Sequence, residues 1–172
     1  MMIKTSLGRD YSLESRYAPL EIVIPIYNEG ENVVKLLKQF EDLIKTEFRV
    51  LLCYDSDDDN IFNYKDELKK FKFEILFVKN PDKGPCAAIK KGLRFGNSDC
   101  VIVYPADDFL NINIIDKMYF SFKDGNDIVV ASRFIRGGSM KGCPLLKSIL
   151  VRVASTTLYL LSSIPVRDAS NG

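Results

Sequence analysis

The 172-residue sequence contains no histidine. This absence excludes catalytic triads built on histidine, histidine general bases and histidine metal ligands. A metal ion in this protein would have to be held by oxygen ligands. Oxygen ligands favour Mg²⁺ or Mn²⁺ over zinc.

The usual phosphate-binding motifs are also missing. There is no G-x-x-x-x-G-K-[ST] loop, and no G-x-G-x-x-G follows the first predicted strand. A diphosphate would therefore be bound by a metal ion together with cationic side chains. These two absences argue against a nucleotide-dependent dehydrogenase and against a P-loop kinase.

Cysteine and net charge are both low. The four cysteines form no C-x-x-C pair, and Cys53 and Cys100 fall inside predicted strands, where a free thiol acts as a small hydrophobic side chain. This usage predicts a reducing, cytoplasmic compartment. The net charge of +1 gives no overall electrostatic attraction for nucleic acid, so no nucleic-acid partner is expected.

No targeting or membrane-spanning segment is predicted. Residues 1–17 lack the apolar stretch of a signal peptide, and residues 149–164 are apolar but too short to span a bilayer and are interrupted by Arg152. We expect a cytoplasmic protein, with the cytoplasmic face of a membrane as an alternative location. Residues 1–19 are expected to form a loose arm, and residues 20–172 a single catalytic domain.

Apolar runs alternate with segments of helical periodicity along the whole chain. Predicted strands cover residues 21–27, 48–54, 73–78, 101–104 and 127–132, with helices between them and a last helix beginning near Leu145. This alternation predicts an α/β fold with a doubly wound, mostly parallel sheet. Because the chain stops at residues 168–172, immediately after a strand-like or loop element, the fold is expected to be cut short at its C-terminus.

Polar and acidic clusters follow three of these predicted strands: Asn28-Glu29, Asp55 to Asp59, and Asp107-Asp108. In open α/β sheets, ligands bind beyond the carboxyl ends of the strands. An acidic turn that caps the next helix is the simpler interpretation of each cluster alone. Their convergence at one edge of one sheet favours a site, where a divalent cation would relieve the repulsion between carboxylates and bind a diphosphate.

Cationic side chains are predicted at the same edge. They are Lys83, Arg133, Arg136, Lys141 and Lys147. Solvated surface charge is the alternative explanation, and it applies less to Arg133, which directly follows a predicted buried strand.

Several of these stretches together resemble family 2 glycosyltransferases with the GT-A (Rossmann-like) fold. The resemblance begins at Ile24-Pro25-Ile26-Tyr27-Asn28-Glu29 and includes Asp55, residues 80–84, Ala106-Asp107-Asp108 and residues 131–138. It ends at Asp168. Within the family the chain is most similar to dolichyl- or polyprenyl-phosphate sugar synthases, which implies roles in cell-envelope glycan synthesis.

The resemblance implies a role for individual residues. It assigns Pro25, Tyr27 and Glu29 to the first nucleotide-binding loop, Asp55 to recognition of the donor base, and Lys83 and Gly84 to the loop beside the nucleotide. Asp107 matches the metal-binding acid that holds the donor diphosphate through Mg²⁺ or Mn²⁺. Arg133 and Lys147 match basic positions near the sugar and the acceptor phosphate, and Asp168 matches the acid of the last motif.

Pro105 stands where the family motif has its first aspartate, so the metal hypothesis rests on Asp107, helped by Asp108. The implied reaction is inverting, metal-dependent transfer of a sugar from a GDP- or UDP-sugar. A polyprenyl phosphate acceptor needs no general base. A saccharide hydroxyl would need one, with Asp168 or Asp108 as candidates.

The last predicted helix is apolar nearly all round, which is typical of a deeply buried helix or of peripheral contact with a membrane surface.

Two other classes of function stay open. One is a nucleotidyltransferase, although residues 28–32 lack its glycine-rich first loop. The other is a non-catalytic module that binds a sugar nucleotide.

Overall fold

The computed structural model describes residues 3–4, 10–11, 18–134, 138, 144–161 and 168. The chain divides into two compact units, Met1–Tyr119 and Phe120–Gly172. At its beginning, strands β1 (Ile3–Lys4) and β2 (Asp10–Tyr11) pair antiparallel.

A four-stranded parallel sheet organises the first unit. Its strand order is β5-β4-β3-β6, and the strands are β3 (Leu20–Ile26), β4 (Phe48–Tyr54), β5 (Glu74–Lys79) and β6 (Cys100–Val103). All seven residues of β4 are buried. A continuous apolar strand of this kind is expected where both faces of a parallel sheet are covered. The predicted doubly wound parallel sheet is confirmed.

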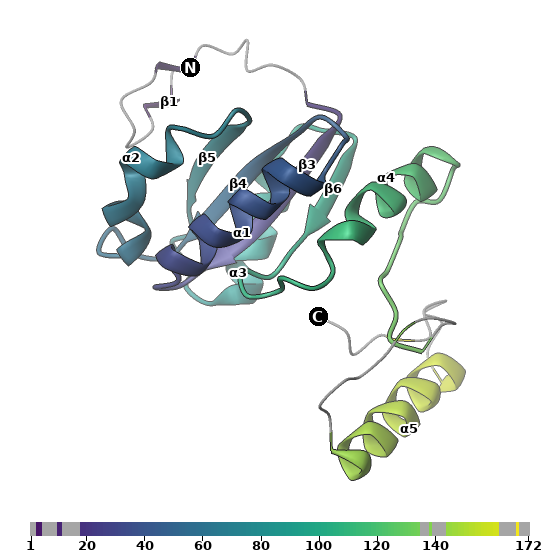
Figure 1. Ribbon diagram of the computed structural model, residues 1–172. Coiled ribbons are helices and arrows are strands. Elements are labelled where there is room, and N and C mark those ends of the chain that lie inside the picture. The colour runs from purple at the N-terminus through teal and green to yellow at the C-terminus, as the bar shows by residue number, and fades with distance from the viewer. Residues whose placement is uncertain are drawn as a thin grey trace. The chain divides into compact units, whose positions relative to one another are not determined.

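Helices cover the two faces of this sheet, as Figure 1 shows for α1 and α3. On one face, Phe40 of α1 packs edge-on against Phe48 and Tyr104. On the other face, Ala88 of α3 packs into a cluster with Val23, Leu51 and further side chains of β4 and β5. The helical segments of this unit are α1 (Gly30–Leu43), η1 (Asn60–Tyr64), α2 (Lys65–Leu68), α3 (Pro85–Phe95) and η2 (Ile112–Ile114).

The buried apolar core belongs to the first unit. Among the described residues, every buried apolar side chain lies between Ala18 and Ile115. Helix α4 (Ile115–Lys123) closes this part of the chain, and Asp116 accepts hydrogen bonds from the backbone of Lys45 and Thr46 after α1. The helix periodicities that predicted these segments are therefore confirmed.

The predicted fifth strand is wrong. Residues 127–132 lie outside any strand, and Ile128 and Val130 are 77% and 39% exposed. Apolar, β-branched residues favour a strand, but a strand also needs a neighbouring strand to bond with, and the described residues of the second unit provide none. The second unit contains instead the predicted last helix, α5 (Leu145–Leu161), of which only Ser155 is buried among the described residues.

A buried ion pair lies near the amino ends of the strands, on the face of the sheet that α3 covers. Glu21, Arg49 and Glu74 occupy neighbouring positions on β3, β4 and β5. Arg49 Nε donates to Glu21 Oε1 at 2.7 Å, and the same guanidinium also bonds the side-chain oxygen of Asn97. The predicted apolar run of the first strand thus contains a fully buried carboxylate that is neutralised by its neighbour.

Within the described residues, no helix is both long and apolar enough to cross a membrane.

Candidate functional site

The candidate site is built at the carboxyl edge of the parallel sheet, where the loops after β3, β4, β5 and β6 emerge. Asp55 directly follows β4, and its carboxylate accepts hydrogen bonds from the loop after β5. Its Oδ1 accepts a hydrogen bond from Asn80 Nδ2 at 2.7 Å, and its Oδ2 accepts one from the Gly84 backbone N–H at 2.7 Å. Asp55 thereby sets the position of Lys83 and Gly84, the two residues predicted to lie beside a nucleotide.

The loop that Asp55 holds has an unusual backbone. Lys83 and Gly84 both have positive φ angles, 52° and 91°. Glycine adopts this conformation without strain, whereas lysine does so rarely. The bend brings Pro85 to the first turn of α3, where a proline is well tolerated because its missing N–H would have no helical partner.

The loop after β3 is held by the loop after β4. Asn28 has a φ of 55°, and its backbone N–H donates to Asp59 Oδ2 at 2.8 Å. Asn60 accepts from the Gly30 N–H at 2.8 Å and donates to the Asn28 carbonyl at 2.9 Å. Asp59 is buried and also caps η1 by accepting from the Ile61 N–H. These bonds fix the start of α1 relative to β4.

This role of Asp59 and Asn60 was not predicted, although Asp59 belongs to the acidic cluster that follows the second predicted strand. A signal was present, because an aspartate directly before a helical segment is a preferred N-cap. The hydrogen bonds of Asp59 and Asn60 with Asn28 and Gly30 join residues about 30 positions apart, and no local sequence pattern predicts them.

The residues predicted for the first nucleotide-binding loop sit at the same edge. Tyr27 is 68% exposed, directly after β3, while Pro25 and Glu29 are partly buried. No hydrogen bond to the Glu29 carboxylate occurs among the described residues. An exposed aromatic ring beside a backbone held by Asp59 and Asn60 provides a surface on which a flat base could stack.

Asp107 and Asp108 differ in their contacts. Asp108 Oδ1 accepts from the backbone N–H groups of Leu110 and Asn111, and its Oδ2 accepts from Asn111 Nδ2 at 2.7 Å. These are the bonds of an acidic turn, the simpler interpretation considered from the sequence. Asp107 is exposed, and within the described part of the chain its carboxylate makes no hydrogen bond or ion pair. Of the two, Asp107 is the carboxylate available to a ligand.

No cluster of three or more acidic or cysteine side chains suited to a metal ion exists among the described residues. A single carboxylate nevertheless fits Mg²⁺ or Mn²⁺ bound together with a nucleotide, because Mg²⁺ commonly takes one or two carboxylates and fills its other positions with water and substrate phosphates. Asp107 is the residue that would hold it.

The second unit brings Arg133 and Asp168 together. Asp168 is fully buried and accepts from Arg133 at the backbone N–H (2.8 Å), at Nε (3.1 Å) and at a terminal guanidinium nitrogen (2.7 Å). The hydrogen bond from the Arg133 side chain is the main reason why the pKa of Asp168 lies below its usual value, and it outweighs the opposing effect of burial.

The remaining predicted residues divide between described and undescribed parts of the chain. Lys147 is exposed in the first turn of α5, and Arg152 of the same helix lies 5.0 Å from the ring centre of Phe134. Arg136 and Lys141 fall outside the described residues. Asp107 belongs to the first unit, and Lys147, Arg133 and Asp168 belong to the second.

Comparisons with known proteins show the family and the fold of this chain. The family model described as "Glycosyl transferase family 2" matches residues 21–168. A dolichol-phosphate mannosyltransferase of Pyrococcus furiosus is 24% identical over 137 residues, covering 78% of this chain and 39% of that protein. An uncharacterised protein of Methanocaldococcus jannaschii is 32% identical over 92 residues, covering 51% of this chain and 39% of that protein.

Among solved structures, Staphylococcus aureus TarS 1–349 in complex with UDP-GlcNAc is similar with a TM-score of 0.50 and 22% identity, over 61% of this chain and 31% of that one. This likeness concerns the fold, and it confirms the predicted GT-A architecture. The chain spans 39% of the length of each of the two curated relatives. Because the family model covers most of its residues, the chain belongs to glycosyl transferase family 2.

Proposed function

We propose that this chain binds a nucleotide diphosphate-sugar, a GDP- or UDP-sugar, and takes part in its transfer to polyprenyl phosphate with inversion at the sugar carbon. The observation that carries the proposal is the loop held by Asp55, which positions Lys83 and Gly84 at the sheet edge where Tyr27 and Asp107 also emerge. The mannosyltransferase relative, whose name contains dolichol phosphate, supports the choice of acceptor.

Asp107 is the proposed ligand of a Mg²⁺ or Mn²⁺ ion. When bound, such an ion would supply positive charge to the leaving diphosphate. The protein's own contribution is to present an exposed carboxylate on a turn fixed by Asp108, and to keep the nucleotide loops rigid through Asp55 and Asp59. Rigid placement of this kind lowers the cost of ordering the donor.

The Arg133–Asp168 pair favours a phosphate acceptor over a saccharide hydroxyl. A general base works best when its pKa lies near the working pH, and Asp168 has a lowered pKa with both oxygens engaged by Arg133. A lipid phosphate is already an anion and requires no base. Asp108 is similarly engaged by turn hydrogen bonds. Arg133 and Lys147 remain the proposed basic residues near the transferred sugar and the acceptor phosphate.

Helix α5 is the element we propose to contact the membrane that contains such an acceptor. Its side chains are apolar on several sides, and Leu146, Leu150 and Leu160 are 70%, 59% and 72% exposed. Lys147 and Arg152 on the same helix would face lipid phosphates.

The test combines a panel of UDP- and GDP-sugars with polyprenyl phosphate or a free saccharide, in Mg²⁺, in Mn²⁺ and in EDTA. We expect a glycosyl phospholipid of inverted anomeric configuration, formed only with a divalent ion. Asp107→Ala should lower this activity by about a hundredfold or more, since it removes the metal ligand. Asp42→Ala, which removes an exposed carboxylate from α1, is the matched control and should keep full activity.

Two results would contradict the proposal. Tight nucleotide binding without turnover on either acceptor would indicate a non-catalytic binding module. Transfer to the saccharide but not to the lipid phosphate would assign the acceptor to the hydroxyl class.

A further inference from the structure

A groove runs along the outer face of α3, on the far side from the sheet. It has a volume of about 430 Å³ and is lined by residues 82–87 together with Lys90, Lys91 and Arg94. Ala88 and Gly92 of the same helix are buried against the sheet, so the groove lies on the opposite, exposed face. Its volume is within the usual range for a small-molecule site.

The groove is strongly positive. Lys83, Lys90, Lys91 and Arg94 line it against one carboxylate, that of Asp82. Among the described residues none of these four cations forms an ion pair. The sequence of α3 contains no acidic residue, and Lys90 and Arg94 are four positions apart, where like charges destabilise a helix.

A lysine of α1 and a lysine next to α2 each pair with a nearby carboxylate. In α1, Lys35 pairs with Glu31 at 2.6 Å, and next to α2, Lys69 pairs with Asp66 at 2.7 Å. Helix α3 lacks this compensation. An anionic ligand would supply the missing counter-charge.

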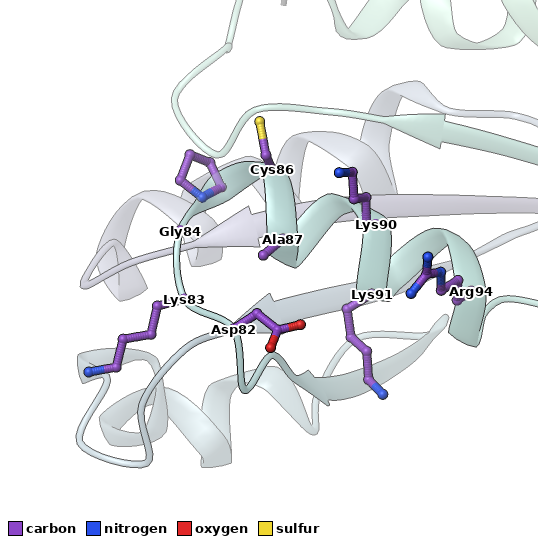
Figure 2. A pocket seen from close by; sticks show the side chains of 9 residues that line it. Asp82, Lys83, Gly84, Cys86, Ala87, Lys90, Lys91 and Arg94 are labelled. Carbon is purple, nitrogen blue, oxygen red and sulfur yellow. The ribbon is translucent and has the colours of Figure 1, made fainter.

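The arrangement of the side chains indicates what kind of anion would fit. In Figure 2, Lys83 and Lys91 lie on either side of Asp82, Lys90 leaves the helix in a different direction from Lys91, and Arg94 lies one turn further along. The positive charge is therefore spread along the groove. A ligand with two or more phosphate groups can contact several of these cations at once, whereas a single phosphate cannot.

We propose that this groove binds a ligand bearing two or more phosphate groups, either a soluble polyphosphate or the headgroups of an anionic lipid surface. This goes beyond the proposed function and does not depend on it. The groove is lined mainly by the outer face of α3, and it shares Asp82, Lys83 and Gly84 with the loop after β5.

The first experiment titrates the full chain with tripolyphosphate in EDTA, without nucleotide, and measures binding by calorimetry. Excluding divalent ions keeps the probe away from a metal-dependent donor site. Lys90→Ala/Lys91→Ala/Arg94→Ala should weaken binding by about tenfold or more, because three charge-assisted contacts are lost. The matched control, Lys69→Ala/Lys70→Ala/Lys72→Ala, removes the same charge elsewhere and should bind like the parent.

The second experiment measures sedimentation of the same three proteins with vesicles of phosphatidylcholine, with and without phosphatidylglycerol. If the α3 variant alone loses the additional sedimentation that phosphatidylglycerol causes, the ligand is the lipid headgroups. An effect limited to tripolyphosphate assigns it to a soluble polyphosphate. If the α3 variant and its control behave alike in both experiments, or if the parent binds neither probe, the proposal is overturned. None of these results depends on sugar transfer.

Discussion

At the scale of single residues, the most demanding position is the buried pair Glu21 and Arg49. Their side chains are 0% and 3% exposed, so each charge depends on the other for compensation. Arg49 also approaches Glu74 at 3.6 Å. Removing one partner of a buried pair is costly, whereas replacing both by apolar residues of similar volume is often tolerated.

Arg49→Ala should therefore lower the free energy of unfolding by about 3–5 kcal/mol, because Glu21 would keep a buried charge without its counter-ion. Urea unfolding measures the change. Glu21→Leu/Arg49→Met should lose less than Arg49→Ala, since neither charge remains. Lys35→Ala, which breaks an exposed ion pair, should leave the midpoint of urea unfolding unchanged. A double variant as unstable as the single one would show that packing, and not charge, explains the loss.

Asp168 is the second residue with a defined electrostatic role. Its folded-state pKa lies below the ordinary value of 3.8, first because of the Arg133 side chain. The pair therefore adds stability at pH values above about 3.8, and this contribution disappears as the pH falls through the lower folded pKa.

Carboxyl-carbon NMR titration of the full chain tests this directly. The Asp168 resonance should titrate below pH 3.8. In Arg133→Ala the midpoint should move upward, because the donor that stabilises the ionised form is gone. A midpoint that stays the same in the variant would show that Arg133 does not control the charge of Asp168.

At the scale of elements, helix α3 lies unusually close to the sheet at Gly92. A Cβ atom on Gly92 would lie 2.5 Å from Val23 Cγ1 and 2.7 Å from Cys53 Sγ. The helix backbone therefore packs directly on β3 and β4. In an exposed helix, replacing glycine by alanine raises the free energy of unfolding by about 0.5–1 kcal/mol. At Gly92 the added Cβ atom would overpack the contact with the sheet, which lowers the free energy of unfolding.

Gly92→Ala should lower the free energy of unfolding by about 1–3 kcal/mol through this overpacking. Chemical denaturation followed by circular dichroism gives the value, and Asp42→Ala on the exposed face of α1 is a control that should cause no loss. If Gly92→Ala proves stabilising, helix propensity outweighs packing and α3 lies further from the sheet in solution.

At the scale of the whole molecule, the two units differ in how they are stabilised. All buried apolar side chains among the described residues belong to the first unit, together with the complete parallel sheet. In the second unit, the described residues bury only Ser155 and Asp168. The cooperative part of the fold should therefore be the first unit.

A fragment ending at Asp124, which keeps α4 and the hydrogen bond from Asp124 N–H to the Phe120 carbonyl, should unfold cooperatively in urea. Far-ultraviolet circular dichroism and dispersed amide NMR signals would report this. A fragment that melts gradually, with collapsed NMR dispersion, would show that the sheet needs the second unit to fold.

The sequence by itself determined the four-stranded parallel sheet with its helices and the family, whereas the paired strands β1 and β2 were not predicted. Continuous apolar runs and helical periodicity are local patterns, so β4 was predicted with the observed limits, and the order of motifs from Tyr27 to Asp168 indicated the family that the comparisons then confirmed. The local pattern wrongly predicted a strand at residues 127–132, because strand formation depends on a neighbouring strand as well as on the segment's own side chains.

Only the tertiary structure decided which polar residues serve the fold and which remain available to a ligand. Asp59 bonds to Asn28 across 31 positions, and Glu21 pairs with Arg49 across 28. The acidic turn after β6 separates Asp108, engaged in the turn, from the exposed Asp107. Contacts between residues far apart in the chain depend on how strands and loops are packed, and no local pattern records that packing.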